Sequence, residues 1–380
     1  NRHTKAYNYE TFCCGQEQRI TPVDAQDATF LTGQEIFAYS RNNKRLAGIG
    51  ILEWEPSDRV HTILDLYYSR FKQRETMRGV QWFSNVWAGD QTFTNVVTED
   101  RDGTELAVSG TANNVAPQVR NDYNKRDDWL FSAALNNEYK FSDQLSLITD
   151  LSYSRNKRIE SVTETYAGYG CCALAADQNA PENFYGDSSS WDLSGDRPRW
   201  SEGLNYADVT QVSLGERTPW GDWGHDGLTK APHVKEQIYA ADGSFRYEPV
   251  NSFIEAVDVG ANFTRRDKDK FVNEFDMNLK NDRLQVLVDD RFIVSPTNLG
   301  YAGWGDVLSL DVPGIMDECY DFSPTEDSNH FDKAWKIRED VLTLKARAQF
   351  AFGNLHGNVG IQAVHQKQRS TGQRINFIDQ

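Results

Sequence analysis

The chain has 380 residues, with 40 Lys and Arg against 56 Asp and Glu, and a formal net charge of -16. Its mean hydropathy is -0.65 and it has no run of about 18 apolar residues, so we expect no transmembrane helix. The first residues lack the charged segment and apolar core of a signal peptide, so we expect any export signal to lie outside residues 1–380, and the acidic balance disfavours nucleic acids as partners. The 27 Gly and 12% aromatic residues favour a β-rich chain over a coiled coil. Apolar runs that would supply ordinary cores are few.

The first predicted element is a β-hairpin over residues 46–72, with its turn at residues 56–59. Alternate side chains of a strand point to opposite faces, so a strand with one apolar and one polar face has a period of two. The second arm follows this period, with Val60, Leu64, Leu66 and Tyr68 on one face and His61, Asp65 and Ser69 on the other. The first arm is less regular, because placing Leu52 outward also places Ile51 inward.

The clearest hairpin covers residues 128–157. Its apolar positions are Trp129, Phe131, Ala133, Leu135, Tyr139, Phe141, Leu145, Leu147, Leu151 and Tyr153. Polar residues fill most of the alternate positions, where Leu130 and Ile148 are the exceptions. Two further hairpins follow, over residues 235–267 and 339–368. The sequence pattern therefore predicts eight strands in four hairpins.

Long polar segments separate these hairpins, at residues 73–125, 158–233 and 268–338. Structureless connections of this length argue against an ordinary compact domain. Outer-membrane barrels have short periplasmic turns and long extracellular loops, and aromatic girdles at both edges of the apolar band. We therefore predict an all-β fold, a transmembrane antiparallel β-barrel, in preference to a soluble β-sandwich, whose strands also alternate.

The parity of the strands predicts which side chains face lipid and which face the interior of the barrel. The residues expected to face lipid are Leu135, Leu147, Val259, Ala261, Leu344 and Ala346. The residues expected to face a lumen are Asp65, Asn136, Asp150, Asp258, Asn262, Lys345 and Arg347. The sequence leaves two roles open for the second set: lining a substrate path, or forming hydrogen bonds with a plug or with water.

Several short segments, taken in order, resemble one family. They are LEWEP at residues 52–56, LDLYYSRF at 64–71, RNDYNKR at 120–126, DLSYS at 150–154, GANFT at 260–264 and GWGD at 303–306. No single segment is specific. The ordered series covers essentially the whole chain and is similar to the TonB-dependent outer-membrane receptors of proteobacteria.

The resemblance implies a barrel of roughly 22 strands that encloses a plug. A TonB box, a plug-like stretch and a final strand ending in an aromatic residue are not found, so we expect residues 1–380 to be a partial barrel domain of a longer receptor. Such a receptor takes up a scarce nutrient across the bacterial outer membrane. Its implied partners are the TonB–ExbB–ExbD complex, outer-membrane lipid and lipopolysaccharide, and a small-molecule or oligosaccharide ligand. The alternatives are a ferric siderophore receptor, and a passive porin or structural barrel.

No enzyme motif such as GxSxG or HExxH is present, so we expect no enzymatic activity, no cofactor and no metal site. The cysteines fall in segments expected outside the cell, where thiols oxidise. Disulfides between loops are therefore predicted within the set Cys13, Cys14, Cys171 and Cys172. Cys319 makes the total odd, which leaves one cysteine unmatched. Vicinal disulfides within each pair are the alternative, although their ring is strained.

Tryptophans in the long connections are the predicted ligand-binding residues: Trp191, Trp200, Trp220, Trp223 and Trp304. Carboxylates lie near them in the sequence: Asp187, Asp192, Asp196, Asp222, Asp226 and Asp306. Flat aromatic faces beside carboxylates suit sugar rings, whereas acidic loops repel an anionic iron chelate. This pattern favours a neutral oligosaccharide, with a cationic ligand left open. The alternative role of the tryptophans is to pack the loops together.

Overall fold

The computed structural model of the protein describes residues 2–11, 17–31, 34–82, 91–169, 186–216, 225–280, 286–325 and 332–373. Most of them lie in one antiparallel sheet with the order β1-β4-β5-β8-β9-β13-β14-β18-β19. Its strands are β1 (Arg2–Thr11), β4 (Gln34–Ser57), β5 (Val60–Trp82), β8 (Gln118–Lys140), β9 (Leu145–Gly168), β13 (Gly227–Tyr247), β14 (Ile254–Leu279), β18 (Trp335–Phe352) and β19 (Leu355–Gly372). Two short strands, β12 (Ser213–Leu214) and β17 (Tyr320–Pro324), pair with β9 and β14. The described residues contain no helix with the length and apolar character to cross a membrane.

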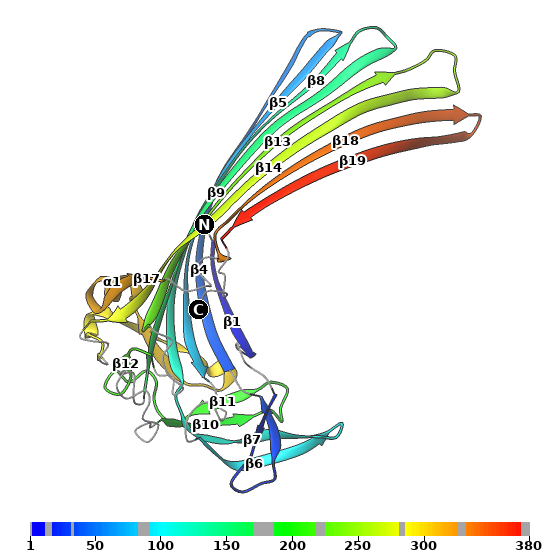
Figure 1. The fold of residues 1–380 in the computed structure, drawn as a ribbon. Helices are drawn as coiled ribbons and strands as arrows, with labels where there is room; N and C mark the ends of the chain where they lie inside the picture. Colours follow the sequence, from blue (N-terminus) through cyan, green and yellow to red (C-terminus); the bar gives the residue numbers. More distant parts are fainter. Residues whose placement is uncertain are drawn as a thin grey trace, which may run out of the picture.

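The eight long strands confirm the predicted all-β architecture of four antiparallel hairpins. Each hairpin pairs along its whole length, as β8 and β9 do from Gln118 opposite Gly168 to Lys140 opposite Ser146. Figure 1 shows one curved sheet, with the tight hairpin turns at one end and the long connections at the other. The predicted asymmetry between short turns and long connections is therefore present in the fold.

The strands are longer than predicted, because they continue into segments that the sequence analysis treated as loops. β5 and β8 remain paired as far as Gln81 and Gln118, whereas the predicted hairpins ended at residues 72 and 128. Beyond the apolar part of the sheet both faces carry polar side chains, so the hydrophobic period of two disappears while the backbone hydrogen bonds continue. The prediction of loops over 73–125, 158–233 and 268–338 was wrong at both ends of each segment.

The long connections also contain secondary structure of their own. A second sheet has the order β11-β10-β7-β3-β2, with β6 paired to β7. Its strands are β2 (Glu17–Ile20), β3 (Ala28–Leu31), β6 (Thr92–Arg101), β7 (Thr104–Val115), β10 (Asp187–Asp192) and β11 (Arg199–Glu202). The third connection holds η2 (Asp290–Phe292), β15 (Ile293–Asn298), η3 (Gly300–Ala302), β16 (Asp306–Leu310) and α1 (Val312–Cys319). Pro313 lies in the first turn of α1, where its missing N–H costs no helical hydrogen bond.

The hydrophobic core lies among these connections and the strand ends that meet them. The rings of Phe30 and Trp191 are 4.5 Å apart, and Trp304 and Tyr206 are among the largest fully buried side chains. A Cβ at Gly110 would lie 2.5 Å from the Trp191 ring, so only glycine leaves room for this packing. The scarcity of apolar runs does not prevent a core at this end of the molecule, because its apolar residues are scattered through polar sequence rather than gathered in runs.

Candidate functional site

The pairing register assigns each side chain of the long sheet to one of two faces, because directly opposite residues point to the same side. One row of opposite residues is Asn136, Asp150, Asp242, Asn262 and Thr343, and a neighbouring row is Leu135, Leu151, Ala241, Phe263 and Leu342. The same register places all seven predicted lumen residues on the face of the first row, the polar face. All six predicted lipid residues lie on the opposite, apolar face. That the polar face lines a lumen stays a prediction.

The apolar face carries an exposed band next to the tight turns. Val259 and Leu344 are each 54% exposed. Aromatic rings border the band on both sides, as the girdles of a membrane barrel do. Near the turns, Tyr139, Phe141 and Phe245 form a chain with centroids 4.9 and 6.4 Å apart, and further along the strands Phe131, Tyr153 and Tyr239 form another with centroids 6.5 and 5.0 Å apart. Eight residues separate Phe131 from Tyr139, which is about 27 Å along the strand.

The outer aromatic row crosses the hydrogen-bonded pairs obliquely. Tyr68 is opposite Phe131, but Phe131 is opposite Arg155, so Tyr153 lies two residues nearer the turn. The step recurs between Tyr239 and Phe263, because Tyr239 is opposite Arg265. One residue of about 3.4 Å per strand spacing of about 4.8 Å corresponds to a tilt of roughly 35°, the tilt that strands have in closed barrels. The band is then roughly 22 Å tall, close to the thickness that barrels present to lipid.

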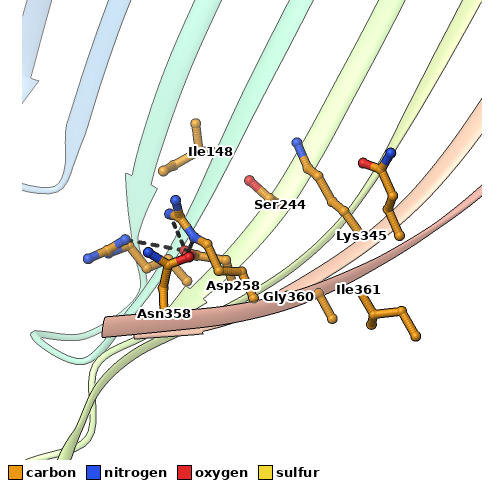
Figure 2. Close-up of a pocket in the computed structure, with 11 residues that line it drawn as sticks. Ile148, Ser244, Asp258, Lys345, Asn358, Gly360 and Ile361 are labelled. Atoms are coloured by element: carbon orange, nitrogen blue, oxygen red, sulfur yellow. Dashed lines mark hydrogen bonds and ion pairs between the residues drawn. The ribbon is translucent and has the colours of Figure 1, made fainter. Parts of the chain in front are cut away.

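The polar face opposite the band is lined by ion pairs between neighbouring strands (Figure 2). Lys345 Nζ lies 2.7 Å from the Asp242 carboxylate, and Arg347 donates two hydrogen bonds of 3.0 and 2.7 Å to Asp258. Arg246 also donates to Asp258, at 3.3 Å. Arg246, Asp258, Lys345 and Arg347 border a hollow of about 550 Å³. Arg246 also donates to Glu248 at 2.7 Å, so the three cations at the hollow are paired with Asp242, Asp258 and Glu248 and leave little net charge.

Four other residues predicted for the lumen lie along the same face. Asn136 donates a 2.6 Å hydrogen bond to Asp150, and Asn262 accepts one of 3.3 Å from Thr264. Asp65 is opposite Ala134, which places it on this face as well. The polar face is therefore continuous across β5, β8, β9, β13, β14 and β18.

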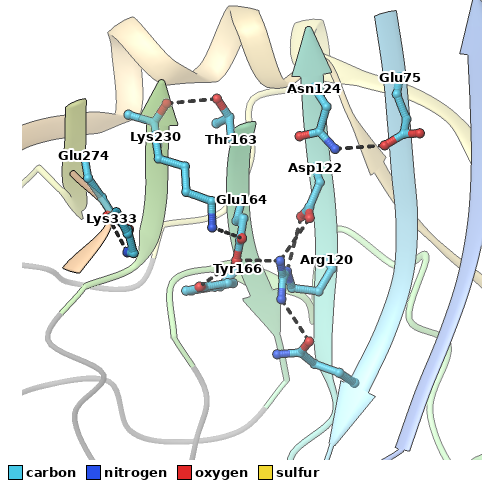
Figure 3. Close-up of polar contacts among 12 residues, drawn as sticks. Glu75, Arg120, Asp122, Asn124, Thr163, Glu164, Tyr166, Lys230, Glu274 and Lys333 are labelled. Carbon is cyan, nitrogen blue, oxygen red and sulfur yellow. Dashed lines mark hydrogen bonds and ion pairs between the residues drawn. The ribbon is translucent and has the colours of Figure 1, made fainter. Parts of the chain in front are cut away.

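Where the polar face reaches the connections, its charges become buried (Figure 3). Arg120 is 7% exposed and donates two hydrogen bonds to Asp122, at 3.2 and 3.0 Å. It also donates to Glu164 at 2.7 Å and to Gln81 at 2.9 Å. Lys230 lies 3.8 Å from the other oxygen of Glu164. Strands β5, β8, β9 and β13 are thus joined by one buried charge cluster, which the sequence analysis missed because its members come from three hairpins.

Burial changes the protonation of this cluster, which lies beyond the apolar band. Burial is the largest influence on Asp122 and, with the charge of Glu164, raises the pKa of Asp122 to about 7 despite Arg120. Burial also acts to raise the pKa of Glu164, but Arg120 and Lys230 outweigh it and lower that pKa. Burial raises the pKa of Tyr166, whose ring lies under the Arg120 guanidinium. The charged groups of the cluster therefore pair with one another, and the Tyr166 hydroxyl donates to Glu164 at 3.4 Å.

The three described tryptophans of the predicted ligand site are core residues. Trp191 and Trp200 are each 2% exposed, and Trp304 is 1% exposed. Trp191 Nε1 donates to the Ala107 carbonyl at 3.1 Å, and the Trp304 ring packs 5.5 Å from that of Tyr206. Their faces are covered by protein, which is the loop-packing role left open above. Stacking of a ligand on them would require this core to open.

The neighbouring carboxylates serve the fold as well. Asp187 accepts hydrogen bonds from the backbone of Gly203 and Leu204 at 3.1 and 3.2 Å, and Asp226 accepts one from Leu279 at 3.0 Å. Burial raises the pKa of Asp187. Trp220, Trp223, Asp222 and the disulfide candidates Cys13, Cys14, Cys171 and Cys172 lie outside the described residues, so the predictions for them stay predictions. Cys319 is a free thiol at the end of α1.

One group of ligand-type side chains was not anticipated. His61 Nε2 lies 2.7 Å from Glu53 and 3.4 Å from Glu55, across the β4–β5 hairpin. Within the described residues these three could supply ligand atoms within 4.8 Å of one another. Both glutamates are exposed, so the group is best described as a surface ion pair beside a turn.

Comparisons with known proteins add little to this geometry. No protein-family model matches the chain, and no curated protein matches it. Among solved structures it is similar to the siderophore receptor PiuA from Acinetobacter baumannii, at a TM-score of 0.27 and 6% sequence identity. The match covers 89% of this chain and 46% of that chain, so the chain spans less than half of that receptor. A likeness of this size carries no argument about function.

Proposed function

We propose that the chain forms part of the barrel wall of a bacterial outer-membrane receptor that takes up a small ligand. One observation carries the proposal: a tilted antiparallel sheet whose exposed apolar band is bordered by aromatic rings and backed by an ion-paired polar face. A β-sandwich buries the apolar face of each sheet under another sheet about 10 Å away. None of the described residues covers the band between the two aromatic rows, whereas lipid would cover it along its whole height.

The test is the polarity of the two faces in the complete receptor. A cysteine introduced at Leu344 or at the adjacent Lys345 is labelled with a polarity-sensitive fluorophore, after reconstitution in lipid vesicles. We expect blue-shifted emission, quenched by brominated lipid, from position 344 only, since position 345 lies on the polar face. The unmodified protein, labelled in parallel, gives the background from its natural cysteines. Equal quenching at both positions would refute the barrel.

We further propose active uptake, powered through TonB, ExbB and ExbD and a plug outside this chain, with no covalent chemistry. This part rests on the ordered sequence resemblance. A passive porin is the competing function, and uptake in cells with and without TonB separates the two. Loss of uptake without TonB supports a receptor, and unchanged uptake would establish a porin.

For the ligand we propose a neutral oligosaccharide. The polar face supports an uncharged ligand, because its cations are matched by anions, as in Lys345 with Asp242 and Arg347 with Asp258. A ferric siderophore is the alternative. We expect Trp220→Ala and Trp223→Ala to reduce oligosaccharide uptake, with Trp54→Ala, at an exposed position beside a hairpin turn, as the matched control. Unchanged uptake in both variants, or binding of an anionic iron chelate alone, would remove the proposal.

A further inference from the structure

A belt of basic side chains lies on the apolar face directly beyond the outer aromatic row. The basic belt consists of Arg70, Lys72, Arg74, Lys125, Arg155, Lys157, Lys235, Arg265, Lys336, Arg338, Lys367 and Arg369. The acidic residues among the same outward positions are Asp127, Asp267, Asp269 and Asp340. Twelve cations against four anions is a large local excess in a chain whose net charge is -16.

The polar face at the same height shows no such excess. Its charged residues there include Arg126, Arg158, Arg266, Lys268, Asp128, Glu160, Glu236 and Glu339. Several are paired, as Arg158 is with Asp128 at 3.0 Å. The cation excess is therefore specific to the side of the sheet that carries the apolar band, and general strand composition does not explain it.

Most of the belt is not neutralised by the protein. Arg70 and Lys72 share Asp127, Arg265 pairs with Asp340, and Arg338 pairs with Asp267. The remaining eight cations form no ion pair with a described residue: Arg74, Lys125, Arg155, Lys157, Lys235, Lys336, Lys367 and Arg369. Like charges this close raise the electrostatic energy of the fold unless a counter-charge is supplied from outside.

The positive charge of the basic belt affects a neighbouring histidine, His233. The His233 and Phe271 rings stack with centroids 4.5 Å apart, between the strands that carry Lys157 and Lys336. Burial and the charge of Lys157 lower the pKa of His233. A second hollow of about 360 Å³ is bordered by Lys336, Arg338 and Arg369 and by Asp267 and Asp269. The belt thus offers a recess in which ammonium and guanidinium groups outnumber carboxylates.

We infer that the basic belt binds the phosphate groups of a phosphorylated glycolipid, lipopolysaccharide, in the outer leaflet. The inference rests on the proposed function, since it takes the apolar band as the part inside the lipid. Headgroup phosphates lie directly beyond the acyl chains, at the height where the belt begins. Guanidinium and ammonium groups are the usual protein partners of phosphate. Their position beside the band selects a lipid phosphate over a soluble phosphorylated ligand.

The test uses the complete receptor in neutral detergent, titrated with lipid A and with lipid A whose phosphates have been removed. The variant is Lys157→Gln/Lys235→Gln/Lys336→Gln, chosen because these three lysines lie on neighbouring strands and form no ion pair with a described residue. The control is Arg59→Gln/Lys140→Gln/Arg197→Gln, three exposed cations outside the belt. Each basic residue near an anionic lipid surface is worth roughly fivefold in affinity, so we expect the triple variant to bind lipid A on the order of 100-fold more weakly.

The outcomes distinguish failure of the inference about the basic belt from failure of the proposed function. A wild-type preference for phosphorylated lipid A, retained by the control and lost by the triple variant, supports the inference. Equal losses in variant and control, or no preference in the wild type, overturn it even where the receptor remains in the outer membrane. A wild-type chain that does not fractionate with the outer membrane overturns the proposed function instead. If the variant does not fold, protection of the three lysines from amine labelling by lipid A in the wild type decides, with Lys140 as the unprotected reference.

Discussion

The long sheet has two halves that use the same face differently. Next to the tight turns the apolar face is exposed, with Leu344 54% accessible. Next to the connections the continuation of that face is covered by protein, and Asn121 is only 1% exposed. Asn121 donates to the Leu308 carbonyl at 3.0 Å and accepts from the Leu310 backbone at 2.9 Å, so β16 lies directly over it. The period of two runs through both halves, but what covers the face changes.

This difference shows where each half obtains its stability. The half next to the connections buries aromatic and aliphatic side chains in a packed core, which stabilises it without any membrane. The half next to the tight turns is stabilised by backbone hydrogen bonds and ion pairs. Its apolar side chains add to the stability of the fold only when lipid covers them. Core substitutions should therefore destabilise the protein in any solvent, whereas substitutions in the band should depend on the bilayer.

The largest effect is expected for Trp304→Ala, in the core beside Tyr206. Removing a buried tryptophan leaves a cavity and costs about 3–5 kcal/mol in unfolding free energy. Trp54→Ala, at a position 59% exposed near a hairpin turn, should cost far less in detergent. Urea unfolding of both variants measures the difference, and equal costs would show that the comparison between the halves is wrong.

A smaller effect is expected for arginine in the band, and it should appear only in lipid. Leu135→Arg should cost about 2–4 kcal/mol in vesicles, because the charge would lie near the middle of the hydrocarbon. Asn136→Arg, one residue away on the polar face, should be mild. Folding into vesicles measures both. If position 136 proved as sensitive as position 135, the assignment of the two faces would have to be reversed or abandoned.

The buried cluster predicts a pH effect of intermediate size. The pKa of Asp122 rises from its usual value near 3.8 to about 7 in the fold, so its contribution to stability is complete below about pH 4 and is lost as the pH rises through 7. The lowered pKa of Glu164 acts in the opposite sense and only below its usual value of 4.5. We expect the wild type to lose on the order of 1–3 kcal/mol between pH 5 and pH 8.

Asp122→Asn removes the titrating group and keeps a hydrogen-bond acceptor for Arg120. The variant should therefore show a flatter dependence of unfolding free energy on pH over the same range. Thermal unfolding at several pH values checks this. An unchanged slope would mean that a different group titrates there.

The smallest effect is expected for the ion pairs of the hollow. Arg347 is about half exposed, and solvent weakens its interaction with Asp258. A double-mutant cycle with Arg347→Ala and Asp258→Ala should give a coupling below about 1 kcal/mol. A coupling of several kcal/mol would indicate that the hollow is closed to water in the folded protein.

Much of the turn-proximal half could be read from the sequence. The four hairpins, their tight turns and the separation of Leu135 from Asn136 follow from a local rule, the alternation of side chains along a strand. The Arg120 cluster could be read only in part. Arg120 and Asp122 share a face by parity, but Glu164 and Lys230 come from other strands, and nothing in their local sequence pairs them.

By itself the sequence determined the strand class, the register parity and the placement of the long connections at one end, because these depend on neighbours within a few residues. Only the tertiary structure decided that Trp191, Trp200 and Trp304 are core residues rather than surface rings, and that Asn121 lies beneath β16. Burial is a property of what covers a side chain. The covering residues come from connections far away in the chain, so no local pattern contains that information.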